Sequence, residues 1–192
     1  IKIIGDHTDK YVQGYFFYDS KKSGGITVSH LRFGDTPIQS AYLIDAADFV
    51  QCSNPSYITR YNMTGDIKEN GTFLFNTSAK SAEELENVLP AFVKRDIANK
   101  NINLYVIDAI KIAAELGLRG RTNTILQSAF FKVANIIPYD QAVEYMNLIE
   151  EVLSKEAYGV GFRKGDVKLR DEVQKILEEM ANDGTVAAIS TK

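Results

Sequence analysis

A short loop near the start of the chain combines two cations with hydroxyl groups and glycines. It lies between the aromatic run YVQGYFFYD and the segment ITVSHLRF, and its residues are Ser20, Lys21, Lys22, Ser23, Gly24 and Gly25. Ammonium groups, hydroxyls and backbone N–H groups that glycine leaves accessible are the groups that bind a phosphate. However, the P-loop order GxxxxGK[ST] is absent, and no helix is predicted directly after the loop to add its dipole. Residue types alone therefore favour a solvated turn, with phosphate binding as the alternative.

Four further residues carry groups that could take part in chemistry. Arg121 and Asn123 open a predicted helix in GLRGRTNTILQ, where a cation beside an exposed amide could bind an anion or a neighbouring domain. His30 lies in a predicted strand without a carboxylate or cysteine partner nearby in the sequence, which favours a hydrogen-bonded structural role. Cys52 has no neighbour that would lower its pKa, so a buried structural thiol is expected. No catalytic constellation is recognised.

Composition and charge exclude several classes of protein. The formal net charge is -3, and lysines and arginines are scattered along the chain, which argues against a nucleic-acid-binding module. No run approaches 18 apolar residues, and the first residues lack the pattern of a signal peptide. One cysteine cannot form an internal disulfide, and one cysteine with two histidines cannot complete a four-ligand zinc site. We therefore expect a cytoplasmic protein with no metal site and no membrane or nucleic-acid partner.

Predicted strands and helices alternate along the chain. The strands are predicted over 11–19, 26–33, 71–78 and 101–108, and 41–52 is predicted as a strand, a short helix and a second strand. The helices are predicted over 82–89, 109–118, 122–136 and 138–155, with Ser81, Asp108 and Pro138 at their starts. Gly117 or Gly120 is predicted to end the helix that Asp108 starts. This rhythm predicts an α/β fold with a mostly parallel sheet covered by helices on both faces, a Rossmann-like three-layer arrangement. Functional loops are expected at the carboxyl ends of the strands.

Long specific strings in the first three quarters of the chain carry a family resemblance. They include IKIIGDHTDKYVQGYFFYDSKKSGGITVSHLRFGDTPIQSAYLIDAADFVQCSNPSYI and LPAFVKRDIANKNINLYVIDAIKIAAELGLRGRTNTILQSAFFKVANIIPYDQAVEYM. Over about residues 1–147 the chain resembles the gamma domain of pyruvate:ferredoxin (flavodoxin) oxidoreductases, in the 2-oxoacid:ferredoxin oxidoreductase superfamily. We assign residues 1–150 to such a domain.

This resemblance implies a part of an enzyme that oxidatively decarboxylates pyruvate to acetyl-CoA. In that family thiamine pyrophosphate and the iron–sulfur clusters belong to other domains, and electrons pass to ferredoxin. The gamma domain is implied to provide scaffolding and contacts to coenzyme A. Under this interpretation Lys21 and Lys22 pair with phosphate oxygens of coenzyme A, while Ser23, Gly24 and Gly25 shape the loop. The implied partners are the other domains or subunits of the oxidoreductase and, indirectly, ferredoxin, and the chain is expected to be inactive alone.

Two departures from the family pattern affect these expectations. Family members have a strand and a GTVGANKNS-like segment upstream of IKIIG, so we expect a fragment that lacks its first strand and its glycine-rich loop. The segment IKIIGDHTD is then the later half of a helix. In GLRGRTN, Arg119 occupies a position where the family usually has glycine, which puts the local backbone in doubt.

The end of the chain resembles a different family. From about Ala157, the stretch AYGVGFRKGDVKLRDEVQKILEEMANDGTVAAISTK resembles the C-terminal segment of solute-binding proteins of amino-acid ABC transporters, and we assign residues 151–192 to this tail. Asp166 is predicted to cap a helix that ends at Gly184, and residues 158–164 are strand-like enough to complete a sheet edge. Such a combination indicates an engineered chimera, a natural fusion or an artefact of a gene model.

Three functions of different classes remain open from the sequence. We favour an oxidoreductase domain that contributes scaffolding and coenzyme A contacts. A purely structural or interaction fragment is the main alternative, and it predicts exposed apolar surfaces that pack against sister domains. An amino-acid-binding module is supported by the tail alone.

Overall fold

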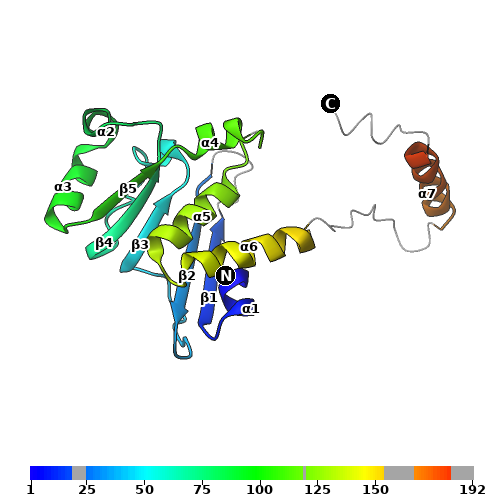
Figure 1. Ribbon diagram of the computed structural model, residues 1–192, viewed down its shortest axis with the longest axis horizontal. Helices are drawn as coiled ribbons and strands as arrows, with labels where there is room; N and C mark the ends of the chain where they lie inside the picture. The colour runs from blue at the N-terminus through cyan, green and yellow to red at the C-terminus, as the bar shows by residue number, and fades with distance from the viewer. Residues whose placement is uncertain (19–24, 119, 154–166, 183–192) are drawn as a thin grey trace. The chain divides into compact units, whose positions relative to one another are not determined.

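The computed structural model describes residues 1–18, 25–118, 120–153 and 167–182. The chain divides into two compact units, Ile1–Val152 and Leu153–Lys192. The first unit contains two small sheets and the helices that cover them, and the second contains a single described helix (Figure 1). None of the helices in the described part of the chain is long and apolar enough to cross a membrane.

A three-stranded parallel sheet forms the centre of the first unit. Its strands are β3 (Ala47–Cys52), β4 (Ile67–Asn76) and β5 (Asn103–Ile107), in the spatial order β3-β4-β5. Parallel strands need a crossover connection, and α2 (Ala82–Val88) and α3 (Ala91–Asn99) supply it between β4 and β5. The predicted strand that begins at residue 71 in fact begins at Ile67. The parallel sheet of the predicted α/β fold is confirmed.

Helices cover both faces of this sheet, as predicted (Figure 1). On one face the side chains of Cys52, Phe73 and Phe75 form a buried cluster with Leu89 and Val93, which lie at the end of α2 and in α3. On the other face Phe49 contacts Phe130 of α5 (Asn123–Ala134), with ring centroids 5.3 Å apart in an edge-on arrangement. Because strand side chains alternate between faces, the two apolar sets of β3 and β4 fill two separate layers.

Capping residues place the starts of two helices where the sequence predicts them. The Ser81 hydroxyl accepts a hydrogen bond from the Glu84 N–H at 3.1 Å, and the Glu84 carboxylate accepts one from the Lys80 N–H at 2.6 Å. Asp108 likewise accepts from the Lys111 N–H at 3.0 Å and caps α4 (Ala109–Glu115). The predicted caps at Ser81 and Asp108 are confirmed.

Helix α4 ends just before Gly117, which is one of the two glycines predicted to end it, and the chain reverses there. Gly117 has a φ of +72°, which residues with a Cβ rarely adopt. The Gly117 N–H donates to the Ala114 carbonyl at 3.1 Å, and the Leu118 N–H donates to the Ala113 carbonyl at 2.8 Å. This is the hydrogen-bond pattern of a Schellman motif, so the helix ends at Glu115 rather than at residue 118.

The strands that flank the lysine loop form a second, separate sheet. β1 (Tyr11–Tyr18) and β2 (Thr27–Gly34) pair antiparallel, from Tyr11 opposite Gly34 to Tyr18 opposite Thr27. Helix α1 (Lys2–His7) precedes them, in agreement with the helix expected for IKIIGDHTD. One face of the hairpin packs into a cluster formed by α1, α5 and α6 (Tyr139–Leu153), which begins directly after Pro138.

The short helix predicted within residues 41–52 is absent, and only the strand Ala47–Cys52 forms there. The preceding residues instead cross the hairpin, and their backbone groups bond to its side chains. Gln13 donates to the Ser40 carbonyl at 2.7 Å, and Arg32 donates to the Tyr42 carbonyl at 2.7 Å. Contacts from distant residues therefore override the local preference for a helical turn.

The second unit contains α7 (Val167–Asn182), in the region of the helix predicted for the tail. Val173 and Met180 of this helix are half-buried, and Val167 and Ile176 are about half exposed. Predicted features that lie outside the described residues are the Asp166 cap, the Gly184 end and the strand over 158–164.

Candidate functional site

The lysine loop connects the two strands of the hairpin at its closed end. Tyr18, the last residue of β1, pairs with Thr27, the first residue of β2. Of the six predicted phosphate-binding residues, Gly25 is described and half-buried. Ser20, Lys21, Lys22, Ser23 and Gly24 lie outside the described residues. The structure therefore describes the two ends of the loop, Tyr18 and Gly25.

One hydrogen bond fixes the end of this loop beside the parallel sheet. The Tyr57 hydroxyl donates to the Gly25 carbonyl at 3.2 Å. Tyr57 ends a short 3-10 helix, Pro55–Tyr57, which follows the carboxyl end of β3. Its ring also packs edge-on against Tyr61, with centroids 5.3 Å apart. The loop thus ends at the edge of the sheet where open α/β folds bind their ligands.

The short helix that carries Tyr57 is fixed by side chains at the end of β3. Asn54 accepts hydrogen bonds from the N–H and the hydroxyl of Ser56, both at 3.0 Å. The Cys52 thiol is fully buried and donates to the Asn54 carbonyl at 3.2 Å. Burial raises the pKa of Cys52 from 9.0 to about 11, so the thiol is protonated at neutral pH. Cys52 is therefore a structural residue here, as its sequence context predicts.

A buried asparagine that sequence reasoning missed joins the carboxyl ends of the strands. Asn76, the last residue of β4, is 2% exposed. Its Nδ2 donates to the Ser53 carbonyl at 2.8 Å, and its Oδ1 accepts from the Ala109 N–H at 3.0 Å. One side chain thus connects the end of β3 to the start of α4. The signal in the sequence was a polar residue that closes the apolar run 73–75.

Asn123 is the predicted site residue, among those that the structure describes, that lines the open groove between the hairpin and the parallel sheet. Tyr18, Thr27, Asn54, Tyr57 and Asn123 all line it. Asn123 is the first residue of α5, so the predicted amide faces the same groove as the loop ends. Arg121 is not among the residues that line this groove, and its N–H donates to the Leu118 carbonyl at 3.0 Å. Arg119 lies outside the described residues.

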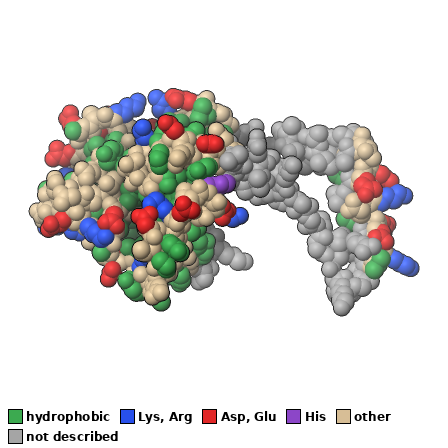
Figure 2. Space-filling view, turned by 60° about the horizontal axis from the view of Figure 1, so that its bottom comes forward, with side chains coloured by type: hydrophobic (Ala, Val, Ile, Leu, Met, Phe, Trp, Pro, Cys, Tyr) green, Lys and Arg blue, Asp and Glu red, His purple; other side chains and the backbone are tan. Residues whose placement is uncertain are grey.

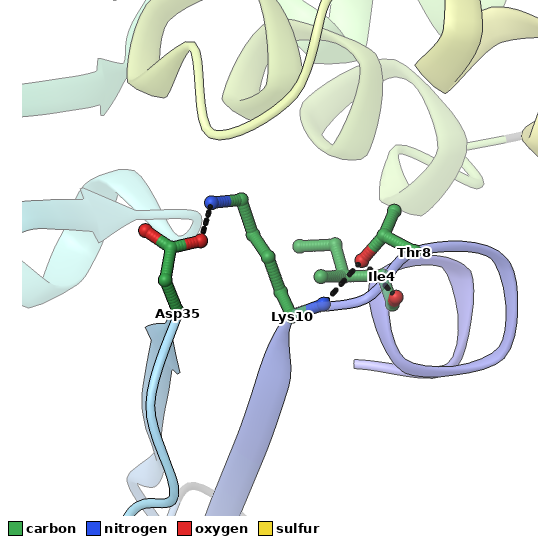
Figure 3. A network of polar contacts seen from close by, with 4 residues as sticks. All are labelled: Ile4, Thr8, Lys10 and Asp35. Atoms are coloured by element: carbon green, nitrogen blue, oxygen red, sulfur yellow. Dashed lines mark hydrogen bonds and ion pairs between the residues drawn. The ribbon is translucent and has the colours of Figure 1, made fainter.

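Every lysine or arginine that lines this groove, among the described residues, already has a partner. Lys10 pairs with Asp35 at 2.7 Å, and Figure 3 shows this contact beside the hydrogen bond from the Lys10 N–H to the Thr8 hydroxyl, which is 3.2 Å long. Lys68 pairs with Asp48 at 2.8 Å, and Arg32 bonds to the Gln13 side chain at 2.9 Å. An anion in the groove would therefore find no unpaired cation on these walls.

Charged side chains on the face shown in Figure 2 are interspersed by sign. On the face of the molecule in Figure 2, lysine and arginine side chains alternate with aspartate and glutamate, and no large patch of one sign is visible. No group of three or more histidine, cysteine, aspartate or glutamate side chains in the described part of the chain could hold a metal ion.

His30 has the structural role that its sequence context predicts. Its Nδ1 accepts a hydrogen bond from the Ile44 N–H at 3.2 Å, and its ring lies 6.5 Å from that of Tyr15, centroid to centroid. With Nδ1 as the acceptor, the ring helps to hold the segment that crosses the hairpin.

Comparison with known proteins identifies the family over most of the chain. The family model described as pyruvate ferredoxin/flavodoxin oxidoreductase matches residues 1–159. The pyruvate:ferredoxin oxidoreductase of Moorella thermoacetica is 56% identical over 186 residues, which is 94% of this chain and 15% of that protein. The pyruvate-flavodoxin oxidoreductase of Enterobacter agglomerans is 58% identical over 146 residues, which is 76% of this chain and 12% of that protein. The chain thus spans less than a sixth of the length of these relatives.

A solved structure shares the fold. The pyruvate oxidoreductase subunit PORC of Thermotoga maritima aligns with a TM-score of 0.52 and 22% sequence identity, covering 73% of this chain and 68% of that subunit.

The comparisons do not support the predicted resemblance of residues 157–192 to solute-binding proteins. An alignment that covers 94% of the chain extends into this tail, so a large oxidoreductase contains a counterpart of it. The interpretation of the chain as a fusion of two families is therefore not supported. The chain belongs to the pyruvate ferredoxin/flavodoxin oxidoreductase family.

Proposed function

We propose that this chain is a domain of a pyruvate:ferredoxin or pyruvate:flavodoxin oxidoreductase and that its lysine loop binds phosphate groups of coenzyme A. In the whole enzyme pyruvate is oxidatively decarboxylated to acetyl-CoA. Thiamine pyrophosphate and iron–sulfur clusters, held by other domains, supply the decarboxylation and electron-transfer chemistry. The contribution of this chain is to bind and orient coenzyme A and to support its sister domains or subunits, so it is inactive alone.

The hydrogen bond from Tyr57 to Gly25 is the observation that carries this proposal. It keeps the end of the lysine loop next to the carboxyl end of β3, where a ligand of a parallel sheet is expected. Lys10, Lys68 and Arg32, the described cations that line the groove, already bind partners within the chain, which also supports the proposal. The positive charge for a phosphate would therefore come from Lys21 and Lys22, with Ser23, Gly24 and Gly25 shaping the loop and Asn123 facing the same groove.

Calorimetric titration of coenzyme A tests this role. We expect the Lys21→Ala, Lys22→Ala variant to bind at least about tenfold more weakly, because a charge-assisted hydrogen bond contributes about 1.5–3 kcal/mol. A Lys111→Ala, Lys175→Ala variant is the matched control, since it removes the same charge from two exposed sites. Dephospho-coenzyme A should bind more weakly than coenzyme A if the loop holds the 3′-phosphate.

Two results would count against the proposal. Equal affinity of the loop variant and the control variant would exclude Lys21 and Lys22 as phosphate ligands. No binding to the unmodified chain would favour the second candidate function, a purely structural domain. The exposed apolar side chains of the hairpin support that second function, because faces that pack against sister domains are left in water when the domain is alone.

A further inference from the structure

One face of the β1–β2 hairpin carries exposed aromatic side chains in a regular pattern. Tyr11, Tyr15 and Phe17 are 48%, 54% and 46% exposed, and their spacing places them on the same face of the strand. Tyr42 and Leu43, in the segment that crosses this face, are 68% and 50% exposed. The face of the hairpin that carries Tyr11, Tyr15 and Phe17, together with Tyr42 and Leu43 of the crossing segment, is called the outward face.

The opposite face of the hairpin meets the helices at the open end of the hairpin, whereas Phe16 and Tyr18, on the same face nearer the loop, are 47% and 67% exposed. Val12 and Phe33, which are cross-strand partners, pack against the buried residues Ile3 and Ile4 of α1 and Phe131 of α5. Because side chains alternate between faces, the helices leave the outward face uncovered apart from the crossing segment. Among the described residues, no helix packs on the outward face.

The polar side chains on the outward face already have hydrogen-bond partners within the chain. Gln13 donates to the Ser40 carbonyl and accepts from Arg32, at 2.7 and 2.9 Å. Arg32 also donates to the Tyr42 carbonyl, and its guanidinium lies 4.9 Å from the centre of the Tyr42 ring. His30 accepts a backbone N–H from the same segment. Covering this face would therefore remove apolar surface from water while leaving few polar groups unpaired.

The size of the exposed surface is that of a functional patch. An aromatic side chain buries about 150–250 Å² when it is covered, so four half-exposed rings leave roughly 300–500 Å² in water. The largest apolar patch on a typical monomer is about 300–600 Å² and often functional. Aromatic residues with satisfied polar neighbours are also typical of the core of an interface.

We propose that the outward face is covered by an apolar protein surface from the part of the longer oxidoreductase that lies outside this chain. The inference rests on the proposed role as one domain of such an enzyme. The chain spans 15% of the length of its Moorella relative, so most of that enzyme is available as the partner. Because the one cation on this face, Arg32, is held within the chain, the partner surface is apolar rather than anionic.

Hydroxyl-radical footprinting with mass spectrometry tests the inference. This chain is compared alone and as a replacement for its aligned segment in the Moorella thermoacetica enzyme. We expect oxidation of Tyr15, Phe17 and Tyr42 to fall about fivefold in the longer protein, because residues in an interface core lose nearly all contact with water. Phe73 and Phe75, which are fully buried, should be protected in both proteins and report that the domain is folded.

Equal oxidation of the outward face in both proteins, with Phe73 and Phe75 protected, would overturn the inference. If the hybrid does not fold, the native Moorella enzyme and its own aligned segment take its place. Hydrogen exchange is then compared over the positions aligned with 11–18, and equal exchange in the two proteins would overturn the inference.

A second copy of this chain is the competing occupant of the outward face. Sedimentation of the chain alone distinguishes self-association from binding to the rest of the enzyme. It is measured for the unmodified chain, for a Tyr15→Ser, Phe17→Ser variant, and for a Val88→Ser, Leu116→Ser control at exposed apolar positions elsewhere. Self-association that the first variant alone abolishes would overturn the proposed partner. A monomeric chain with protection in the hybrid supports it. Neither readout uses coenzyme A, so a failure of the phosphate-binding role would be seen separately in the titration.

Discussion

The hydroxyl of Tyr57 donates a hydrogen bond to the carbonyl of Gly25, although the two residues are 32 positions apart in the sequence. This contact connects the end of the lysine loop to the segment that follows β3. It also couples the two sheets of the first unit, because the loop belongs to the hairpin and Tyr57 follows the parallel sheet.

Removing the Tyr57 hydroxyl should loosen the loop without disturbing the fold. We expect Tyr57→Phe to lower the free energy of unfolding by about 0.5–1.5 kcal/mol, the net contribution of a typical hydrogen bond. Coenzyme A affinity should also fall if the loop binds its phosphates. Denaturant unfolding and calorimetry measure the two effects. Tyr61→Phe is the control, since that ring makes the edge-on contact and its hydroxyl has no partner among the described residues. Equal effects of both changes would contradict the prediction.

Substitution of Asn76 should lower the stability of the fold more than substitution of an exposed asparagine. Asn76→Ala leaves the Ala109 N–H without its acceptor and the Ser53 carbonyl without its donor. Each unsatisfied buried group costs about 1–3 kcal/mol, so we expect a loss of about 2–4 kcal/mol in urea unfolding. Asn99→Ala, at an exposed helical position, should change stability by less than about 0.5 kcal/mol. A similar small change for Asn76→Ala would show that this bridge is dispensable.

The Cys52 thiol should make stability depend on pH in the alkaline range. Burial raises its pKa in the folded state to about 11 from 9.0, so its protonated form is favoured by folding. The stabilisation is fully present below pH 9 and is lost as the pH rises toward about 11. The difference in unfolding free energy between the unmodified chain and Cys52→Ala should therefore shrink over this range. A difference that stays constant from pH 8 to pH 11 would show that the pKa of Cys52 is not raised in the folded state.

Gly117 should tolerate a side chain less well than Gly34 does. The φ of +72° at Gly117 is costly for alanine, and we expect Gly117→Ala to destabilise the chain by about 1 kcal/mol. At Gly34 a Cβ would meet the Thr36 carbonyl oxygen at 3.6 Å, an ordinary contact, and the φ is not in the left-handed region. Gly34→Ala is therefore the matched control, with little change expected in its thermal midpoint. The reverse order of the two midpoints would exclude the explanation by backbone conformation.

Features that depend on neighbouring residues could be predicted from the sequence. The capping residues Ser81 and Asp108 act on N–H groups three positions later, so each signal is complete within one helical turn. The alternation in 26–33 likewise predicts a strand, and the resemblance of residues 1–147 predicts the family. The resemblance suggested for residues 157–192 is shorter, and the comparisons do not support it.

Features that depend on distant partners were decided by the tertiary structure. Residues 41–46 are not helical because Arg32 and His30 bond to backbone groups 10 and 14 positions away. Asn76 joins residues 23 positions before it and 33 after it, and Tyr57 reaches Gly25 across 32. Periodicity and capping patterns describe interactions within a few residues, so they contain no information on such pairs. The sequence by itself therefore determined the family and most of the elements, whereas the packing of hairpin against sheet decided the course of residues 41–46 and which residues meet at the candidate site.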